Sequence, residues 1–76
     1  MLKIGRYRHY KGKEYRVIGI AKHSETLEDL VVYEALYKNE VSKFWCRPLK
    51  MFTEKVEVDS KQISRFEYIG DSFLRD

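Results

Sequence analysis

The chain has 76 residues, of which 43% are apolar and 14% aromatic, and it carries a formal net charge of +3. A chain of this length forms one small domain, residues 1–76, and its apolar and aromatic content excludes intrinsic disorder. The single cysteine, Cys46, excludes an intramolecular disulfide and a cysteine-based metal site. No apolar run reaches the about 20 residues that span a membrane, and no apolar signal segment begins the chain, so we expect a cytoplasmic protein.

The charges are segregated along the chain. Residues 1–22 have a balance of +6 and residues 23–37 one of −4, whereas residues 38–55 return to +3 and residues 56–76 fall to −2. Such segregation can steer a charged ligand, or it can be compensated within the folded protein.

Short runs of β-branched and aromatic residues predict strands. The first two, residues 4–10 and 14–21, flank a turn at Lys11 and Gly12 in which the glycine supplies a positive φ. The second strand has apolar residues on both faces, which predicts burial on both sides of a curled sheet. Gly19 is the residue at which this strand can bend.

The rest of the chain continues this pattern. Pro48, which cannot donate a backbone hydrogen bond, ends one strand and begins a single helical turn at residues 48–52. A turn at Asp59 and Ser60 separates the last two strands, and residues 69–76 form a predicted frayed tail. The remaining predicted strands are residues 30–37, 43–47, 55–58 and 62–68.

Five or six short strands, one helical turn near Pro48 to Phe52 and no long helix predict an all-β fold. The spacing favours a small SH3-like antiparallel β-barrel, with an OB-like barrel as the alternative.

Residues 22–30 form a polar stretch between two apolar runs. His23, Ser24 and Glu25 are the residue types of a hydrolytic triad, but neighbours in an extended chain point to opposite faces and cannot form one. His23 and Glu25 could still share a face, which makes them the candidate catalytic pair of a minimal hydrolase. The alternatives are a turn whose backbone is capped by side chains such as Thr26, and a loop that binds a small polar ligand.

Trp45 is the only tryptophan, and it shares a strand face with Lys43 and Arg47. A tryptophan beside two cations is typical of an exposed stacking and anion-binding surface, whereas a core position is the alternative. His9 and His23 lie far apart without the spacing of metal ligands, so we expect no metal and no cofactor.

Taken together, several motifs resemble the bacterial domain of unknown function numbered sixteen fifty-three. The resemblance covers residues 5–67 and implies a free-standing SH3-like barrel, but no established activity. Cys46 stands where we expect valine or another apolar residue. The motifs are residues 5–12 (GRYRHYKG), 15–17 (YRV), 23–28 (HSETLE), 31–33 (VVY), Leu36 with Tyr37, Trp45, Arg47 with Pro48, and Met51 with Phe52.

The leading functional hypothesis is a non-enzymatic binding module. An acidic loop and exposed aromatic residues would recognise a small polar ligand, or a peptide or protein segment bearing Arg or Lys. We expect no membrane partner, and both a monomer and a homodimer fit. The predicted binding residues are Tyr10, His23, Ser24, Glu25, Thr26, Glu28, Tyr33, Trp45 and Arg47.

Two alternatives remain open. Basic residues interleaved with aromatic ones suit nucleic-acid or nucleotide binding, although the net charge of +3 is modest for this role. A minimal hydrolase using His23 is less favoured, because so small a barrel has little depth in which to exclude water. The basic residues of the first alternative are Arg6, Arg8, Lys11, Lys13, Arg16 and Arg47.

Overall fold

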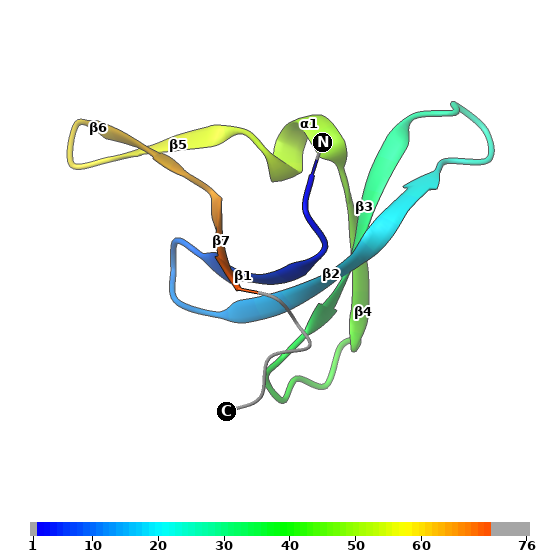
Figure 1. Cartoon of the computed structure of the whole chain (residues 1–76), viewed down its shortest axis with the longest axis horizontal. Helices are drawn as coiled ribbons and strands as arrows, with labels where there is room; N and C mark the ends of the chain where they lie inside the picture. The colour runs from blue at the N-terminus through cyan, green and yellow to red at the C-terminus, as the bar shows by residue number, and fades with distance from the viewer. Residues whose placement is uncertain (1, 71–76) are drawn as a thin grey trace.

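The computed structural model describes residues 2–70, which form seven β-strands and one helical turn (Figure 1). The predicted all-β class, the antiparallel pairing and the helical turn are confirmed. Within these residues no helix is long and apolar enough to cross a membrane. In chain order the elements are β1 (Gly5–His9), β2 (Glu14–Lys22), β3 (Asp29–Ala35), β4 (Phe44–Pro48), α1 (Leu49–Phe52), β5 (Lys55–Val58), β6 (Lys61–Ser64) and β7 (Phe66–Gly70).

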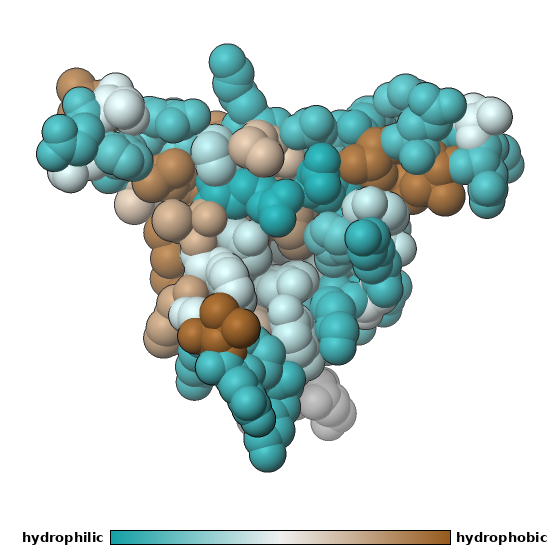
Figure 2. All heavy atoms as spheres, turned by 180° about the vertical axis from the view of Figure 1, so that it is seen from behind, coloured by the Kyte–Doolittle hydropathy of each residue, from teal (hydrophilic) through white to brown (hydrophobic). Residues whose placement is uncertain are grey.

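Five of the strands form one antiparallel sheet in the order β4-β3-β2-β1-β7, and β5 pairs only with β6. Across residues 2–70 no pairing joins β4 to β7, so the predicted barrel is open. The sheet curls strongly, and the β5–β6 and β2–β3 hairpins project on opposite sides of α1 (Figure 1). Seen from behind, the molecule has many hydrophilic side chains over both hairpins, with hydrophobic patches on the β5–β6 hairpin at the right and along the left flank (Figure 2).

The described strands number seven because the predicted strand at residues 62–68 is divided at Arg65. The Arg65 N–H donates to the carbonyl oxygen of Glu54 at 3.2 Å, and its carbonyl accepts the N–H of Tyr10 at 2.9 Å. Arg65 is therefore held between the start of β5 and the end of β1, where the chain passes from the hairpin into the main sheet. Residues 69 and 70 lie in β7, and the remainder of the predicted tail lies outside the described residues.

The bend predicted in β2 is a β-bulge. The pairing of β2 with β3 shifts between Val17 and Gly19, so that Ile18 is an extra residue. Val17 is buried, but Ile18 and Ile20 are 44% and 46% exposed. Burial on both faces of this strand is therefore a wrong expectation, because both isoleucines remain exposed, although the bulge brings Ile20 opposite the buried Val31.

The core fills the concave face of the sheet. Phe52 of α1 stacks on Phe66 of β7 with ring centroids 4.0 Å apart and planes 5° apart. Pro48 precedes α1 with φ of −52°, the value that its ring imposes, and so directs the chain into the turn that buries Phe52. The buried cluster comprises Tyr7, Val17, Val31, Tyr33, Phe52 and Phe66.

Candidate functional site

The polar loop between β2 and β3 uses its side chains to satisfy its own backbone. The His23 Nδ1 accepts the backbone N–H of Glu25 at 3.0 Å and that of Thr26 at 3.3 Å. The Thr26 hydroxyl accepts the N–H of Glu28 at 3.2 Å, and the N–H of His23 donates to the carbonyl of Glu28 at 2.9 Å. These contacts are those of a capped turn, which was the structural alternative for this stretch.

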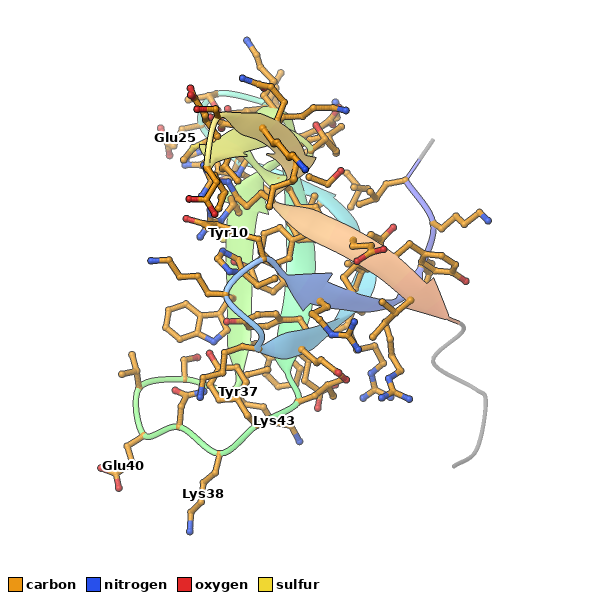
Figure 3. The ribbon with its side chains drawn as sticks, turned by 90° about the vertical axis from the view of Figure 1, so that its left-hand side faces the viewer. Tyr10, Glu25, Tyr37, Lys38, Glu40 and Lys43 are labelled. Carbon is orange, nitrogen blue, oxygen red and sulfur yellow. The ribbon has the colours of Figure 1, made fainter. Side chains whose placement is uncertain are left out.

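The candidate catalytic pair is not assembled as such. Among residues 2–70 no hydrogen bond or ion pair joins the imidazole of His23 to the side chain of Ser24 or Glu25. Ser24 and Glu25 are exposed, and Glu25 extends from the tip of the hairpin (Figure 3). No group of three or more His, Cys, Asp or Glu side chains in the described part of the chain could hold a metal ion.

The structure places Trp45 and the acidic loop apart. Trp45 is half-buried, packs against the core and pairs in register with Tyr33, which is itself only 4% exposed. Tyr33 lies four residues along β3 from Asp29, so that roughly 13 Å of strand separates Trp45 from the start of the loop. The indole Nε1 of Trp45 is buried and has no acceptor among the described residues.

A different set of side chains comes together where the end of β1 meets β7 and β4. The ring centroids of His9 and Tyr10 are 4.6 Å apart, and the edge of His9 packs on Phe66 at 4.9 Å. The guanidinium carbon of Arg47 lies 5.6 Å from the centroid of the same Phe66 ring. We name this set the rim cluster, which comprises His9, Tyr10, Tyr15, Tyr37, Arg47 and Phe66.

Two tyrosines complete the rim cluster. The hydroxyls of Tyr15 and Tyr37 are hydrogen-bonded at 2.8 Å, and Tyr15 packs on Phe66 with centroids 5.7 Å apart. Burial, followed by the hydrogen bond with Tyr37, raises the pKa of the Tyr15 phenol well above its usual value. Lys13 lies 4.6 Å from the centroid of the Tyr37 ring, and Tyr10 and Tyr37 are on the same side of the molecule (Figure 3).

Several basic residues outside the rim cluster are neutralised by carboxylates. Glu14 accepts hydrogen bonds from Arg6 at 3.1 Å and from Arg8 at 3.3 Å. These two guanidinium groups hold the pKa of Glu14 below its usual value. Arg6 and Arg8 thus share one carboxylate partner within the protein, and the side chain of Arg8 remains 49% exposed.

Glu34 likewise neutralises two cations, Arg16 and Lys43. It is 6% exposed, accepts the Nε of Arg16 at 3.0 Å and forms an ion pair with Lys43 at 3.3 Å. The hydrogen bonds from Arg16 lower the pKa of Glu34, against the opposing effect of its burial, and Lys43 adds to the lowering. A buried carboxylate with two cationic partners is part of the scaffold of the sheet.

The cations at the rim cluster are not compensated in this way. Lys11, Lys13 and Arg47 form no ion pair within residues 2–70. Burial, followed by the positive charges of Arg47, Arg65 and Lys11, lowers the pKa of His9. The Nδ1 of His9 accepts the N–H of Lys11 at 3.1 Å, so the neutral ring carries its proton on Nε2.

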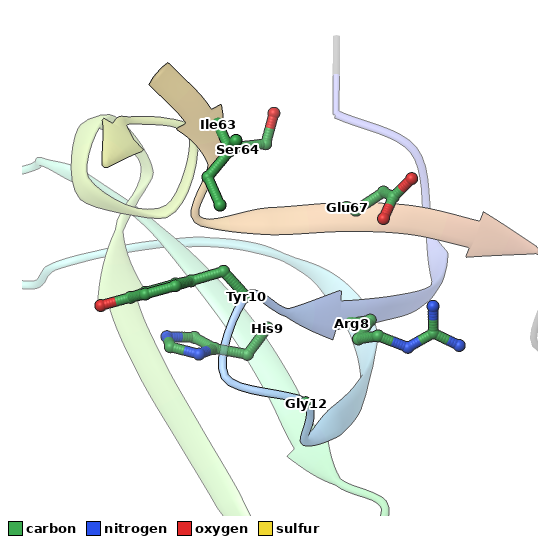
Figure 4. A pocket seen from close by; sticks show the side chains of 7 residues that line it. All are labelled: Arg8, His9, Tyr10, Gly12, Ile63, Ser64 and Glu67. Carbon is green, nitrogen blue, oxygen red and sulfur yellow. The ribbon is translucent and has the colours of Figure 1, made fainter. Parts of the chain in front are cut away.

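A recess adjoins the rim cluster. Its volume is about 440 Å³, and it lies between the β1–β2 turn and the junction of β6 with β7. The rings of His9 and Tyr10 lie side by side along it, below Ile63 and Ser64 (Figure 4). The rim cluster therefore combines ring faces, uncompensated positive charge and an adjoining space.

Comparison with known proteins identifies the family. Residues 5–68 match the family described as a protein of unknown function, DUF1653. The chain belongs to this family. The crystal structure of a DUF1653 protein from Bordetella bronchiseptica is 35% identical in sequence and has a TM-score of 0.88, over 97% of this chain and 95% of that chain. The resemblance inferred from the motifs is thus confirmed, and no curated protein matches the chain.

Within this DUF1653 fold, the sequence pointed to only part of the rim cluster. Tyr10 and Arg47 are among the predicted binding residues, whereas His9, Tyr15, Tyr37 and Phe66 are not. His9 follows Arg8 and precedes Tyr10, and this alternation of basic and aromatic residues was the available signal. Phe66 could not be added without knowing that β7 pairs with β1.

Proposed function

We propose that this protein is a non-enzymatic binding module whose rim cluster receives a ligand that combines a planar group with negative charge. The observation that carries the proposal is the position of Lys11, Lys13 and Arg47, which lie beside aromatic rings and form no ion pair among residues 2–70. Ring faces bind flat groups by stacking, and guanidinium and ammonium groups bind anions. Both kinds of group are combined here on one surface.

A peptide bearing Arg or Lys is a poorer fit to this surface, because it would meet like charge at the rim cluster. The acidic loop remains the predicted site for such a peptide. Its Glu25 and Glu28 form no ion pair in the described part of the chain. Residues 23–28, however, contain no Tyr, Trp or Phe on which a partner could stack.

A catalytic role at the recess has less support than a binding role. The recess contains Ser64 and Glu67 as well as His9, which are residue types of a hydrolytic site. Within residues 2–70 no hydrogen bond links the Ser64 hydroxyl to His9, and the Nδ1 of His9 already accepts the backbone N–H of Lys11. A nucleophile activated by a base requires that missing contact.

The proposal is tested by calorimetric titration with adenosine monophosphate, adenosine and inorganic phosphate. We expect the nucleotide to bind more tightly than either of its parts, because only the nucleotide supplies both a ring and a charge. Arg47→Gln should weaken nucleotide binding about tenfold, the usual effect of losing one charge-assisted contact. Lys50→Gln is the matched control, because Lys50 is exposed and has no part in the rim cluster.

Two results would contradict the proposal. The first is equal binding of adenosine and the nucleotide, which would show that charge has no part in recognition. The second is nucleotide binding that Arg47→Gln and Lys50→Gln leave equally unchanged.

A further inference from the structure

We infer that the ligand of the rim cluster is single-stranded nucleic acid, whose bases stack on Tyr10 and Tyr37 while its phosphates lie near Lys11, Lys13 and Arg47. This inference rests on the proposed function and names its ligand class. A single strand requires more of the surface than a nucleotide does, because it needs at least two stacking positions and a cation near each of them.

The first stacking position is the His9–Tyr10 pair. The two rings are tilted by only 31° at a centroid distance of 4.6 Å, so His9 supports one face of Tyr10. Tyr10 is 37% exposed, which leaves ring surface for a base. An aromatic ring held by a second ring loses little freedom when a base stacks on it.

The second stacking position is Tyr37, which belongs to the connection between β3 and β4. Its hydroxyl is held by the hydroxyl of Tyr15 at 2.8 Å, and its ring packs edge-on against Tyr15 at 5.4 Å. Tyr37 is half-buried and lies on the same side of the molecule as Tyr10 (Figure 3). A single planar ligand would occupy one such position, whereas a strand can occupy both.

The cations are distributed as a strand requires. Lys11 lies 5.8 Å from the centroid of the Tyr10 ring, and Lys13 lies 4.6 Å from that of Tyr37. Arg47 supplies a third charge over the ring of Phe66. Each ring therefore has a cation close by, as the bases and phosphates of an extended strand need, and stacking tolerates every base.

Duplex nucleic acid fits less well. In a duplex the base faces are already stacked on one another and are unavailable to Tyr10 and Tyr37. The helix of the described residues, α1, has four residues, too few to act as a recognition helix in a groove. An acidic peptide would satisfy the cations but would offer no planar group to the rings.

The test measures fluorescence anisotropy of a labelled ten-nucleotide RNA of mixed sequence and of the DNA of the same sequence. The comparison ligands are the annealed duplex, adenosine monophosphate and a poly-glutamate peptide of similar charge. We expect a single strand, RNA or DNA, to bind more tightly than all three. The logarithm of the affinity should fall with that of the salt concentration, with a slope of about −2 for three phosphate contacts.

Two sets of variants measure the contributions of stacking and of charge to single-strand binding separately. Tyr10→Ala should weaken single-strand binding between about fivefold and about 100-fold, whereas Tyr10→Phe, which keeps the ring, should bind as the wild type does. Replacement of Lys11 and Lys13 by Gln should reduce the salt slope by about 1.4, and replacement of Lys50 and Lys55 by Gln should leave the slope unchanged. A dispersed amide spectrum checks that each variant is folded.

Each other outcome decides against the inference. If the mononucleotide binds at the rim cluster but the single strands bind no more tightly, the inference fails and the proposed function stands. If neither binds, both fail. If the duplex or poly-glutamate binds as tightly as the single strand, unpaired bases are not what the surface recognises. If Tyr10→Ala and Tyr10→Phe bind the single strand equally well, the ring of Tyr10 does not stack on a base.

Discussion

The two histidines of the chain are held by the same local contact. In each, Nδ1 accepts the backbone N–H of the residue two positions later, at 3.1 Å from Lys11 and at 3.0 Å from Glu25. Their surroundings differ, because His9 packs on aromatic rings among cations and His23 lies at a hairpin turn. The first is therefore part of a candidate binding surface, and the second stabilises a turn.

The lowered pKa of His9 predicts a pH dependence of stability. Because the pKa is lower in the folded protein than in the unfolded chain, the unfolded chain binds more protons as the pH falls below the unfolded value of about 6.5. The stability that neutral His9 contributes is therefore full above about pH 6.5 and is lost as the pH falls through the folded pKa. His9→Asn keeps an oxygen that can accept the Lys11 N–H but does not titrate.

Urea unfolding of the wild type and His9→Asn across this pH range checks the prediction. The wild type should lose more of its free energy of unfolding than the variant does on acidification. Parallel pH profiles of the two proteins would show that His9 is not linked to folding.

At His23, we expect the turn to depend on an acceptor rather than on an imidazole. His23→Ala removes the acceptor for two backbone N–H groups and should lower the free energy of unfolding by about 0.5–1 kcal/mol, whereas His23→Asn should restore most of that loss. Urea midpoints measure the difference. If Asn is no better than Ala, the Nδ1 contacts do not stabilise the turn. A hydrolytic activity that required His23 would be lost in both variants.

Among the elements, the β5–β6 hairpin has a turn whose two central residues are not those that its backbone favours. Asp59 and Ser60 adopt φ values of 52° and 65°, a pair of left-handed residues that forms a two-residue hairpin turn and favours Asn-Gly. Replacing Asp59 by Asn and Ser60 by Gly should stabilise the hairpin by about 0.5–1 kcal/mol.

Amide hydrogen exchange of β5 and β6 measures this change. We expect exchange in the hairpin to slow by about two- to fivefold, because it opens less often. Unchanged exchange would indicate that the turn does not limit the opening of the hairpin.

The open edge of β4 is protected by short-range contacts. The Ser42 hydroxyl donates to the carbonyl of Phe44 at 2.7 Å and accepts its N–H at 3.2 Å, and Pro48 at the other end has no N–H to offer. Edge strands protected in this way resist pairing with another chain. The two ends of β4 are therefore poor templates for strand pairing with a second copy of the chain.

The elements that could be predicted from sequence are those fixed by local chemistry. Gly12 has φ of 107° in the predicted turn, and Pro48 separates a strand from a helical turn as expected. The division at Arg65 depends on backbone partners at Glu54 and Tyr10, far away in the sequence. For the same reason, only part of the candidate site could be predicted. Aromatic and basic residues can be identified in a sequence, but their grouping around Phe66 depends on the pairing of β1 with β7.

Across the whole molecule, the segregation of charge along the sequence becomes a separation in space. β2 runs nine residues from the basic turn at Lys11 and Lys13 to the acidic loop that begins at His23. A strand of this length extends roughly 30 Å, which places the two charged regions at opposite ends of β2. An anionic ligand is thereby attracted to the end that carries the rim cluster and repelled from the other.

The central claim, that the rim cluster is the binding surface, is tested most directly by an amide chemical-shift map. The protein is labelled with nitrogen-15 and titrated with adenosine monophosphate. We predict the largest shifts at residues 9–13, Tyr37, Arg47 and Phe66, with the amides of residues 23–28 unmoved. Shifts concentrated in residues 23–28, with the rim cluster unaffected, would contradict the account.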